Sequence, residues 1–198
     1  MLTRLNKRKL TLGVFFGVLL AASSASSLWI AAPALLPWTL DPTNPGVSLE
    51  DVERKVIQRY PKPQITPASL AEMLANVNVT LFDVRTQEEF DAGHLPGAIR
   101  IEPGATAKEI VKLHGDRLDD GPVVFYCAVG VRSSRMMVRA RQEITPLARY
   151  GAYNLRGGVF RWTADGRTMV RGDEQGAAHP FDEDWGELLA RTLKDQRR

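Results

Sequence analysis

One cysteine in this chain stands where a polypeptide can make it a nucleophile. The apolar run 123–126 predicts a buried strand, and residues 133–144 predict a helix, with Cys127 and a short loop between them. The sulfur would then lie at the carboxyl end of a strand, where open parallel sheets bind ligands. The N–H groups of a loop that contains Gly130, the helix N-terminus and the nearby Arg132 all favour a thiolate. We therefore predict that Cys127 is a catalytic nucleophile that needs no histidine as its base.

Two simpler interpretations stay open at this stage. A cysteine after an apolar strand is often a small buried hydrophobe. Arg132 could pair with a carboxylate for structural reasons instead of holding an anionic substrate through its fork of donors.

Two further motifs accompany the cysteine loop. Residues 81–99 contain Asp83-Val-Arg85 and, after an acidic-aromatic turn, Gly93-His94-Leu-Pro-Gly-Ala, while residues 154–162 contain a Gly-Gly pair and end in Trp162. With the spacing of Cys127, four residues and Arg132, these motifs resemble the rhodanese (thiosulfate sulfurtransferase) homology domain, and they cover roughly half of the chain.

The resemblance implies an α/β fold, a parallel sheet flanked by helices on both faces, and Cys127 as the catalytic residue. It implies a substrate-binding loop made of Ala128, Val129, Gly130, Val131, Arg132 and Ser133. We interpret Asp83, Arg85 and His94 as supporting residues, with His94 as a hydrogen-bonded turn residue. No cofactor is expected. No metal is expected either, because the chain has a single cysteine and three dispersed histidines.

The implied activity is transfer of a sulfane sulfur from thiosulfate or a persulfide donor, via a Cys127 persulfide, to a thiol or cyanide. The acceptor must come from outside, and a protein thiol is one candidate, because no second cysteine can resolve the persulfide. Many rhodaneses carry a cation directly after the cysteine. Ala128 stands there in this chain, which makes thiosulfate a poor donor and favours an uncharged persulfide.

Two other classes of function remain as alternatives. One is a non-catalytic rhodanese-like binding module at the membrane. The other is a phosphatase or arsenate reductase of the same fold. The related phosphatases place five residues between cysteine and arginine, whereas this chain has four, which favours sulfur.

The charge of the chain is distributed unevenly. Of 26 Lys and Arg, four lie in residues 1–9 and none in residues 10–38, which leaves 22 against 23 acidic residues in 39–198, a net of −1. Nucleic-acid binding by a basic surface therefore loses its support. The uncharged stretch exceeds the approximately 20 residues that cross a bilayer, and the preceding cations predict a cytoplasmic N-terminus. We expect a membrane anchor with the rest of the chain on the exported, periplasmic or extracytoplasmic side, or a cleaved signal segment and a soluble exported domain.

Elements and boundaries follow from local patterns. We divide the chain into a basic N-terminus (1–9), an anchor or signal segment (10–38), a linker with a short helix (39–63), the rhodanese-like domain (64–165) and a C-terminal extension with a terminal helix (166–198). Ser48 is expected to cap the first of these helices, and Thr66-Pro67 to open the next. Strands are predicted at 77–84, 99–101, 123–126 and 152–155, with helices at 106–113, 133–144 and 183–194.

Overall fold

The computed structural model describes residues 40–196, and its centre is a five-stranded parallel sheet. The strand order is β1-β5-β4-β2-β3, so that β4 lies in the middle. The strands are β1 (Gln64–Ile65), β2 (Thr80–Asp83), β3 (Ile99–Arg100), β4 (Val123–Tyr126) and β5 (Ala152–Leu155). The predicted α/β architecture with a parallel sheet is confirmed.

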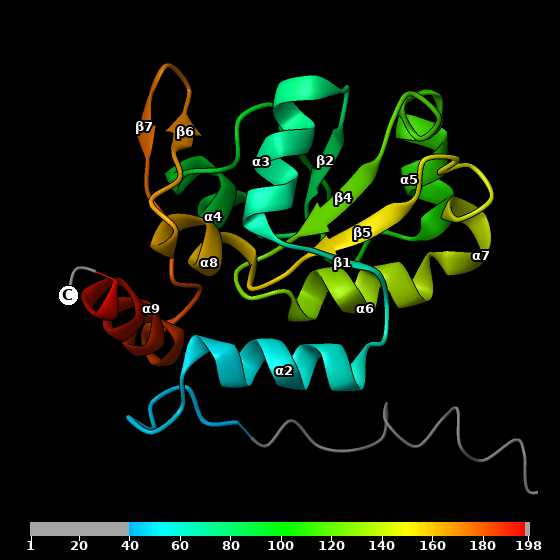
Figure 1. Ribbon diagram of the computed structural model, residues 1–198. Coiled ribbons are helices and arrows are strands. Elements are labelled where there is room, and N and C mark those ends of the chain that lie inside the picture. The colour runs from blue at the N-terminus through cyan, green and yellow to red at the C-terminus, as the bar shows by residue number, and fades with distance from the viewer. Residues whose placement is uncertain (1–39, 197–198) are drawn as a thin grey trace, which may run out of the picture.

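Helices cover both faces of this sheet (Figure 1). Successive side chains of a strand point to opposite faces. Val124 and Tyr126 accordingly join one core cluster while Val123 and Phe125 join the other. The first cluster is shared with α2 (Leu49–Arg59), α3 (Pro67–Asn76), α8 (Gly158–Ala164) and α9 (Glu183–Asp195). The second is shared with α5 (Ala107–His114), α6 (Val131–Arg139) and α7 (Arg141–Ile144).

The smaller elements lie around this core. They are α4 (Gln87–Ala92), the 3₁₀ turn η1 (Gly115–Arg117) and an antiparallel hairpin of β6 (Met169–Arg171) and β7 (Glu174–Gly176). The sequence analysis did not predict α4, α8, β1 or the hairpin. The two helices are only six and seven residues long, and β1 has two residues. Such elements are too short for a hydrophobic period to identify them.

The capping signals that the sequence shows do operate. Ser48 Oγ accepts from the Asp51 N–H to start α2, and Thr66 caps α3 with Pro67 at its first position. The strand predicted from residue 77 is shorter, because Val77 is the C-cap of α3 and β2 begins at Thr80.

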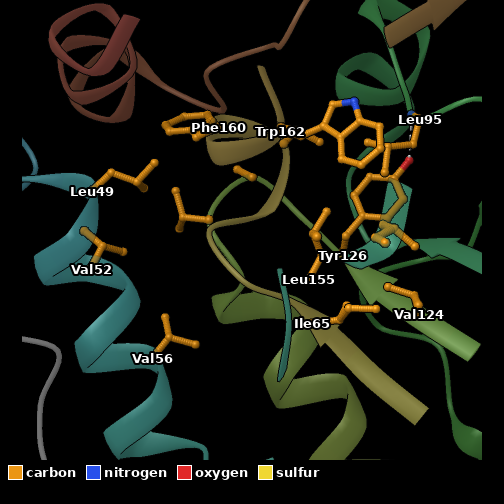
Figure 2. Packing of buried hydrophobic residues seen from close by; sticks show 14 of the residues in the cluster. Leu49, Val52, Val56, Ile65, Leu95, Val124, Tyr126, Leu155, Phe160 and Trp162 are labelled. Atoms are coloured by element: carbon orange, nitrogen blue, oxygen red, sulfur yellow. Dashed lines mark hydrogen bonds between the residues drawn. The ribbon is translucent and has the colours of Figure 1, made fainter. Parts of the chain in front are cut away.

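The segment 40–63 and the tail are both part of the folded body. Leu49, Val52 and Val56 point from α2 into the core, and Phe160 and Trp162 come to it from α8 (Figure 2). The buried carboxylate of Glu53 accepts hydrogen bonds from two arginines of the 156–161 segment, each at 2.7 Å. The terminal helix was expected at 183–194 and is observed as α9. It packs through two buried leucines, Leu188 and Leu189.

Within residues 40–196, no helix is both long and apolar enough to cross a membrane. The predicted anchor or signal segment at 10–38 and the basic residues 1–9 lie outside the described residues. Their roles remain predictions from the sequence.

Candidate active site

Cys127 follows the central strand β4 directly and begins a tight loop that leads into α6. Its side chain is buried, with 1% exposed. The N–H of Gly130 donates to Cys127 Sγ at 3.2 Å. Gly130 has a φ of +93°, in a region that side chains disfavour, and a Cβ there would lie 3.0 Å from Asn154 Nδ2. Glycine is therefore needed for the loop to turn its amide toward the sulfur.

The helix that follows begins at Val131, two residues earlier than the sequence indicated, and it ends at Arg139 instead of continuing to Ile144. Gly130 is its N-cap, and no side chain caps the first turn. The positive end of the nine-residue helix α6 consequently lies next to the sulfur, with its first amides not taken by a capping group. The loop and the start of α6 thus present N–H donors at the position of the sulfur.

Two carbonyl groups of the loop accept hydrogen bonds from α8. The Val159 N–H donates to the Cys127 carbonyl at 3.0 Å, and the Phe160 N–H donates to the Ala128 carbonyl at 3.1 Å. A Cβ on Gly158 would lie 2.2 Å from the Cys127 carbonyl oxygen. The second glycine of the Gly-Gly motif therefore allows α8 to approach the loop closely and fix its orientation.

Ser133 joins the loop to β5. Its hydroxyl lies 2.6 Å from Asn154 Oδ1 and 3.5 Å from Cys127 Sγ. A hydroxyl has one hydrogen to donate, so the shorter bond to Asn154 dominates and the contact with sulfur is weak. Asn154 is itself fixed by Gln64, whose Oε1 accepts from Asn154 Nδ2 at 2.8 Å.

Arg132 is paired, which changes the charge that was expected beside the sulfur. Its two terminal nitrogens donate to the Glu89 carboxylate at 2.7 and 2.6 Å. Burial alone would lower the pKa of Arg132, but Glu89 and Cys127 outweigh it and raise that pKa. The sequence analysis counted Arg132 among the groups that favour a thiolate and left open its pairing with a carboxylate. The structure shows that pairing: Arg132 keeps its charge, and Glu89 balances much of it.

Glu89 has two functions in this arrangement. Its carboxylate accepts from the Thr86 N–H at 3.1 Å and so completes the capping box of α4. The same carboxylate positions Arg132, and burial leaves 1% of its side chain exposed. Burial alone would raise the pKa of Glu89, but Arg132 and Thr86 outweigh it and hold that pKa below its usual value.

The three residues interpreted as supporting lie in the scaffold around the loop. Asp83 and Arg85 form a fully buried ion pair at 2.6 Å, and Arg85 also donates to the Gly93 carbonyl at 2.7 Å. Arg85 lies over the ring of Tyr126, the residue before the cysteine. His94 Nδ1 is 3.0 Å from the Phe90 carbonyl, and its ring stacks on Phe90. These contacts fix the turn and the end of β2, and none of them reaches the sulfur.

A pocket of about 310 Å³ opens above the loop. The loop and α6 form its floor, and two segments far away in the sequence form its walls. Its lining residues are Arg59, Tyr60, Cys127, Ala128, Val129, Val131, Arg132, Arg135, Phe181 and Trp185. The sequence analysis did not assign Arg59, Tyr60, Arg135, Phe181, Trp185, Glu89 or Asn154 to the site. Glu89 and Asn154 belong to the quoted motifs, and that was the available signal for them.

Phe181 is held in an unusual conformation at the pocket mouth. Its φ is +78°, which is rare for a bulky side chain and costs energy. Its ring lies 4.7 Å from the Arg132 guanidinium carbon, a cation–π contact. Phe181 thus covers one face of the Arg132 guanidinium, and Glu89 binds the edge of the same group. Among residues 40–196, no group of three or more His, Cys, Asp or Glu side chains could hold a metal ion.

This fold and this site define a class of α/β proteins in which a cysteine lies in an anion-binding loop between a central strand and a helix. The profile of the rhodanese-like domain matches residues 66–165, and the chain belongs to this family.

Several relatives show how far the similarity extends. The chain is 32% identical over 111 residues to the thiosulfate:glutathione sulfurtransferase of Homo sapiens, which covers 50% of this chain and 92% of that protein. It is 43% identical over 67 residues to the HTH-type transcriptional regulator Rv0324 of Mycobacterium tuberculosis, covering 34% of this chain and only 28% of the regulator.

Solved structures are similar over the same region. The rhodanese-related protein from Thermoplasma volcanium is 23% identical, covers 55% of this chain and 98% of that one, and has a TM-score of 0.43. The human single-domain sulfurtransferase is 30% identical, covers 51% of this chain and 95% of that one, and has a TM-score of 0.39.

Proposed function

We propose that the protein is a sulfurtransferase that carries a sulfane sulfur as a persulfide on Cys127. The observation that supports this most strongly is the Gly130 N–H donating to Cys127 Sγ at 3.2 Å, at the uncapped N-terminus of α6. Preorganised donors of this kind stabilise an anion without reorganisation. The 32% identity to a human thiosulfate:glutathione sulfurtransferase supports the same activity.

The proposed cycle has two displacements at sulfur. The Cys127 thiolate attacks the outer sulfur of thiosulfate; the new S–S bond forms as the old one breaks, and sulfite leaves with the bonding pair. The outer sulfur of the persulfide, now anionic, projects into the pocket. A thiolate or cyanide then attacks that outer sulfur, takes it as a persulfide or thiocyanate, and Cys127 recovers the bonding pair as a thiolate. The cycle is ping-pong, as a covalent intermediate requires.

Intact-mass measurement tests the covalent step. The full chain mixed with an organic persulfide, or more slowly with thiosulfate, is expected to gain about 32 Da, the mass of one sulfur in a persulfide. It is expected to lose that mass when cyanide is added, with thiocyanate formed. The Cys127→Ser variant is expected to show neither. Sulfur transfer by Cys127→Ser would refute the mechanism. An unmodified wild-type cysteine in the presence of both thiosulfate and an organic persulfide would favour the non-catalytic binding module.

We also propose, from the sequence alone, that residues 10–38 attach the protein to a membrane with the rhodanese-like domain on the exported side. The support is the uncharged stretch preceded by four cations. A reporter enzyme active only outside the cytoplasm, fused after residue 198, is expected to be active. If that fusion is inactive, and a reporter that is active only in the cytoplasm works when fused at the same position, this topology is wrong.

A further inference from the structure

A series of buried hydrogen bonds leads to the sulfur of Cys127. Ser133 and Asn154 are fully buried, and Cys127 is 1% exposed, so bulk water does not supply these groups with other partners. The Ser133 hydroxyl oxygen lies 2.6 Å from Asn154 Oδ1 and 3.5 Å from Cys127 Sγ. Because a hydroxyl carries a single hydrogen, the direction of that hydrogen decides whether Ser133 donates to the sulfur or presents lone pairs to it.

The far end of the series fixes the direction of every donor in it. The Lys62 carbonyl can only accept, and it receives a hydrogen bond from Gln64 Nε2 at 3.2 Å. Gln64 therefore turns Oε1 toward Asn154, whose Nδ2 donates to it at 2.8 Å. The Leu155 carbonyl, also only an acceptor, receives a second hydrogen bond from Asn154 Nδ2 at 3.3 Å. The Asn154 oxygen thus faces Ser133, and the hydroxyl hydrogen points away from the sulfur.

The neighbouring strand β1 supplies the residue that orients Asn154. Gln64 of β1 pairs in register with Asn154 of β5, and side chains paired in this way lie on the same face of a sheet. Gln64 precedes residue 66, where the segment that matches the family begins. The hydrogen bonds that orient Ser133 therefore begin at a residue outside the family motifs.

The direction of the Ser133 hydrogen affects the two displacement steps in opposite ways. In the loading step Cys127 attacks as a thiolate, and a hydrogen bond to its sulfur would stabilise the reactant more than the transition state. In the transfer step the same sulfur is the leaving group and gains charge as the S–S bond breaks, so the same hydrogen bond would accelerate it. Thiolates in general attack more slowly and leave faster as their basicity falls.

We propose that Asn154 is a positioning residue that keeps the Ser133 hydrogen off the Cys127 sulfur, and that Gln64 sets the orientation of Asn154. This inference rests on the proposed sulfurtransferase function and adds the residues that balance its two steps. Cys127 attacks the donor without a hydrogen bond from Ser133, and the new S–S bond forms as the bond in the donor breaks. The persulfide then persists, because its inner sulfur is a poorer leaving group, until an acceptor attacks the outer sulfur and the bonding pair returns to Cys127.

The two half-reactions are measured separately on the full chain. Loading by an organic persulfide or by thiosulfate, whichever reacts faster, and discharge by cyanide are each followed by intact mass, as the gain or loss of about 32 Da. All variants are compared at one pH on the high-pH plateau of the loading rate. The variants are Asn154→Leu, which keeps the shape of the side chain and removes the acceptor, Ser133→Ala, and the two combined. Asn76→Leu is the matched control, because Asn76 is exposed at the end of α3.

The proposal predicts opposite changes in the two rates. In Asn154→Leu the hydroxyl loses its acceptor and turns to the sulfur, so loading should slow about fivefold and discharge should accelerate about fivefold. Ser133→Ala should change both rates less than about twofold, since the hydrogen that it removes does not reach the sulfur. The double variant should match Ser133→Ala, because Asn154 acts through the hydroxyl. Asn76→Leu should match the wild type.

The outcomes separate this inference from the proposed function. A wild-type protein that gains sulfur from neither donor overturns the sulfurtransferase function and the inference with it. If the wild type gains sulfur but Asn154→Leu slows both steps or neither, the inference is wrong and the function stands. A Ser133→Ala variant that loads faster and discharges more slowly than the wild type would show that the hydroxyl already donates to the sulfur, which also overturns the inference. Ser133→Ala gives this answer even if Asn154→Leu fails to fold.

Discussion

The Glu89→Gln substitution tests whether Glu89 supports the fold and positions Arg132. The carboxylate is almost fully buried, with 1% of the side chain exposed, and it receives two guanidinium hydrogen bonds at 2.6 and 2.7 Å. Glutamine has the same shape but offers one acceptor oxygen where glutamate offers two. Its amide nitrogen would face an N–H of Arg132, so one bond is lost and the other loses its charge.

The expected cost follows from these contacts. A hydrogen bond to a charged group contributes about 1.5–3 kcal/mol. The Arg132 side chain is 22% exposed, so water compensates part of the loss, and we expect about 2 kcal/mol of destabilisation. For a chain of this size that corresponds to a decrease in Tm of about 4–8 °C.

The effect should depend on pH with a defined sign. The pKa of Glu89 in the folded protein is lowered from 4.5. The stability that ionised Glu89 contributes is therefore complete above the pKa of Glu89 in the unfolded chain. It is lost as the pH falls through the pKa of Glu89 in the folded protein. The difference in Tm between wild type and Glu89→Gln should be full at pH 7 and should shrink at pH values below 4.5.

Thermal unfolding of the full chain in mild detergent measures this difference. Glu88→Gln is the matched control, because Glu88 lies on the same helix with 84% of its side chain exposed; its change should stay within about 0.5 kcal/mol. Equal Tm values for wild type and Glu89→Gln at pH 7, or a difference that persists undiminished at pH 3, would refute the reasoning.

Three further substitutions, the first with a matched control, test other parts of the structure. Gly158→Ala places a Cβ 2.2 Å from the Cys127 carbonyl oxygen, whereas Gly172→Ala at a similar φ of +58° meets nothing within 4 Å. Gly158→Ala should lower the free energy of unfolding by more than 3 kcal/mol, and Gly172→Ala by about 1–2 kcal/mol. Equal costs in urea unfolding would contradict the close approach of α8 to the loop. Glu53→Gln weakens the attachment of α2 to its two arginine partners, so limited proteolysis between residues 40 and 60 should accelerate, and an unchanged digestion rate would exclude that role. Phe181→Gly relieves a strained φ of +78° and removes the ring over Arg132. These effects on stability oppose each other at about 1 kcal/mol each, so Tm should change little while KM for the acceptor rises. A KM equal to that of wild type would show that the ring does not contact the ligand.

The strand, loop and helix that carry the cysteine could be predicted from the sequence because their signals are local. The apolar run 123–126, Gly130 and the polar helix start all lie within a dozen residues of Cys127. The predicted start of α6 was two residues too late. Helix boundaries depend on the backbone conformation of the N-cap, here a glycine with positive φ, and residue type alone does not fix that conformation.

The charge at the site could not be predicted in the same way. Arg132 meets Glu89 across 43 residues, and Ser133 meets Asn154 across 21. All four residues were visible in the motifs, but a motif does not say which side chains face each other. The pairing depends on the parallel order of β2, β4 and β5, which brings the loops after these strands to the same edge of the sheet.

The same distinction applies to the substrate. Ala128 was expected to leave the site short of positive charge and to favour an uncharged donor. In the folded chain, Arg59 from α2 and Arg135 from α6 line the pocket over the cysteine. Those cations are absent from the loop sequence and present at the site.

The sequence by itself determined the parallel α/β fold and the family, and it predicted Cys127 as a nucleophile followed by a loop of four residues, because each is encoded in contiguous residues or in motifs of fixed order. Only the tertiary structure decided what surrounds the sulfur: that Glu89 balances Arg132, that α8 orients the loop carbonyls, and that α2 and the C-terminal segment complete the pocket. The physical reason is that ion pairs and pocket walls form between side chains brought together by the path of the whole chain, and their energies depend on burial and distance, which no local pattern specifies.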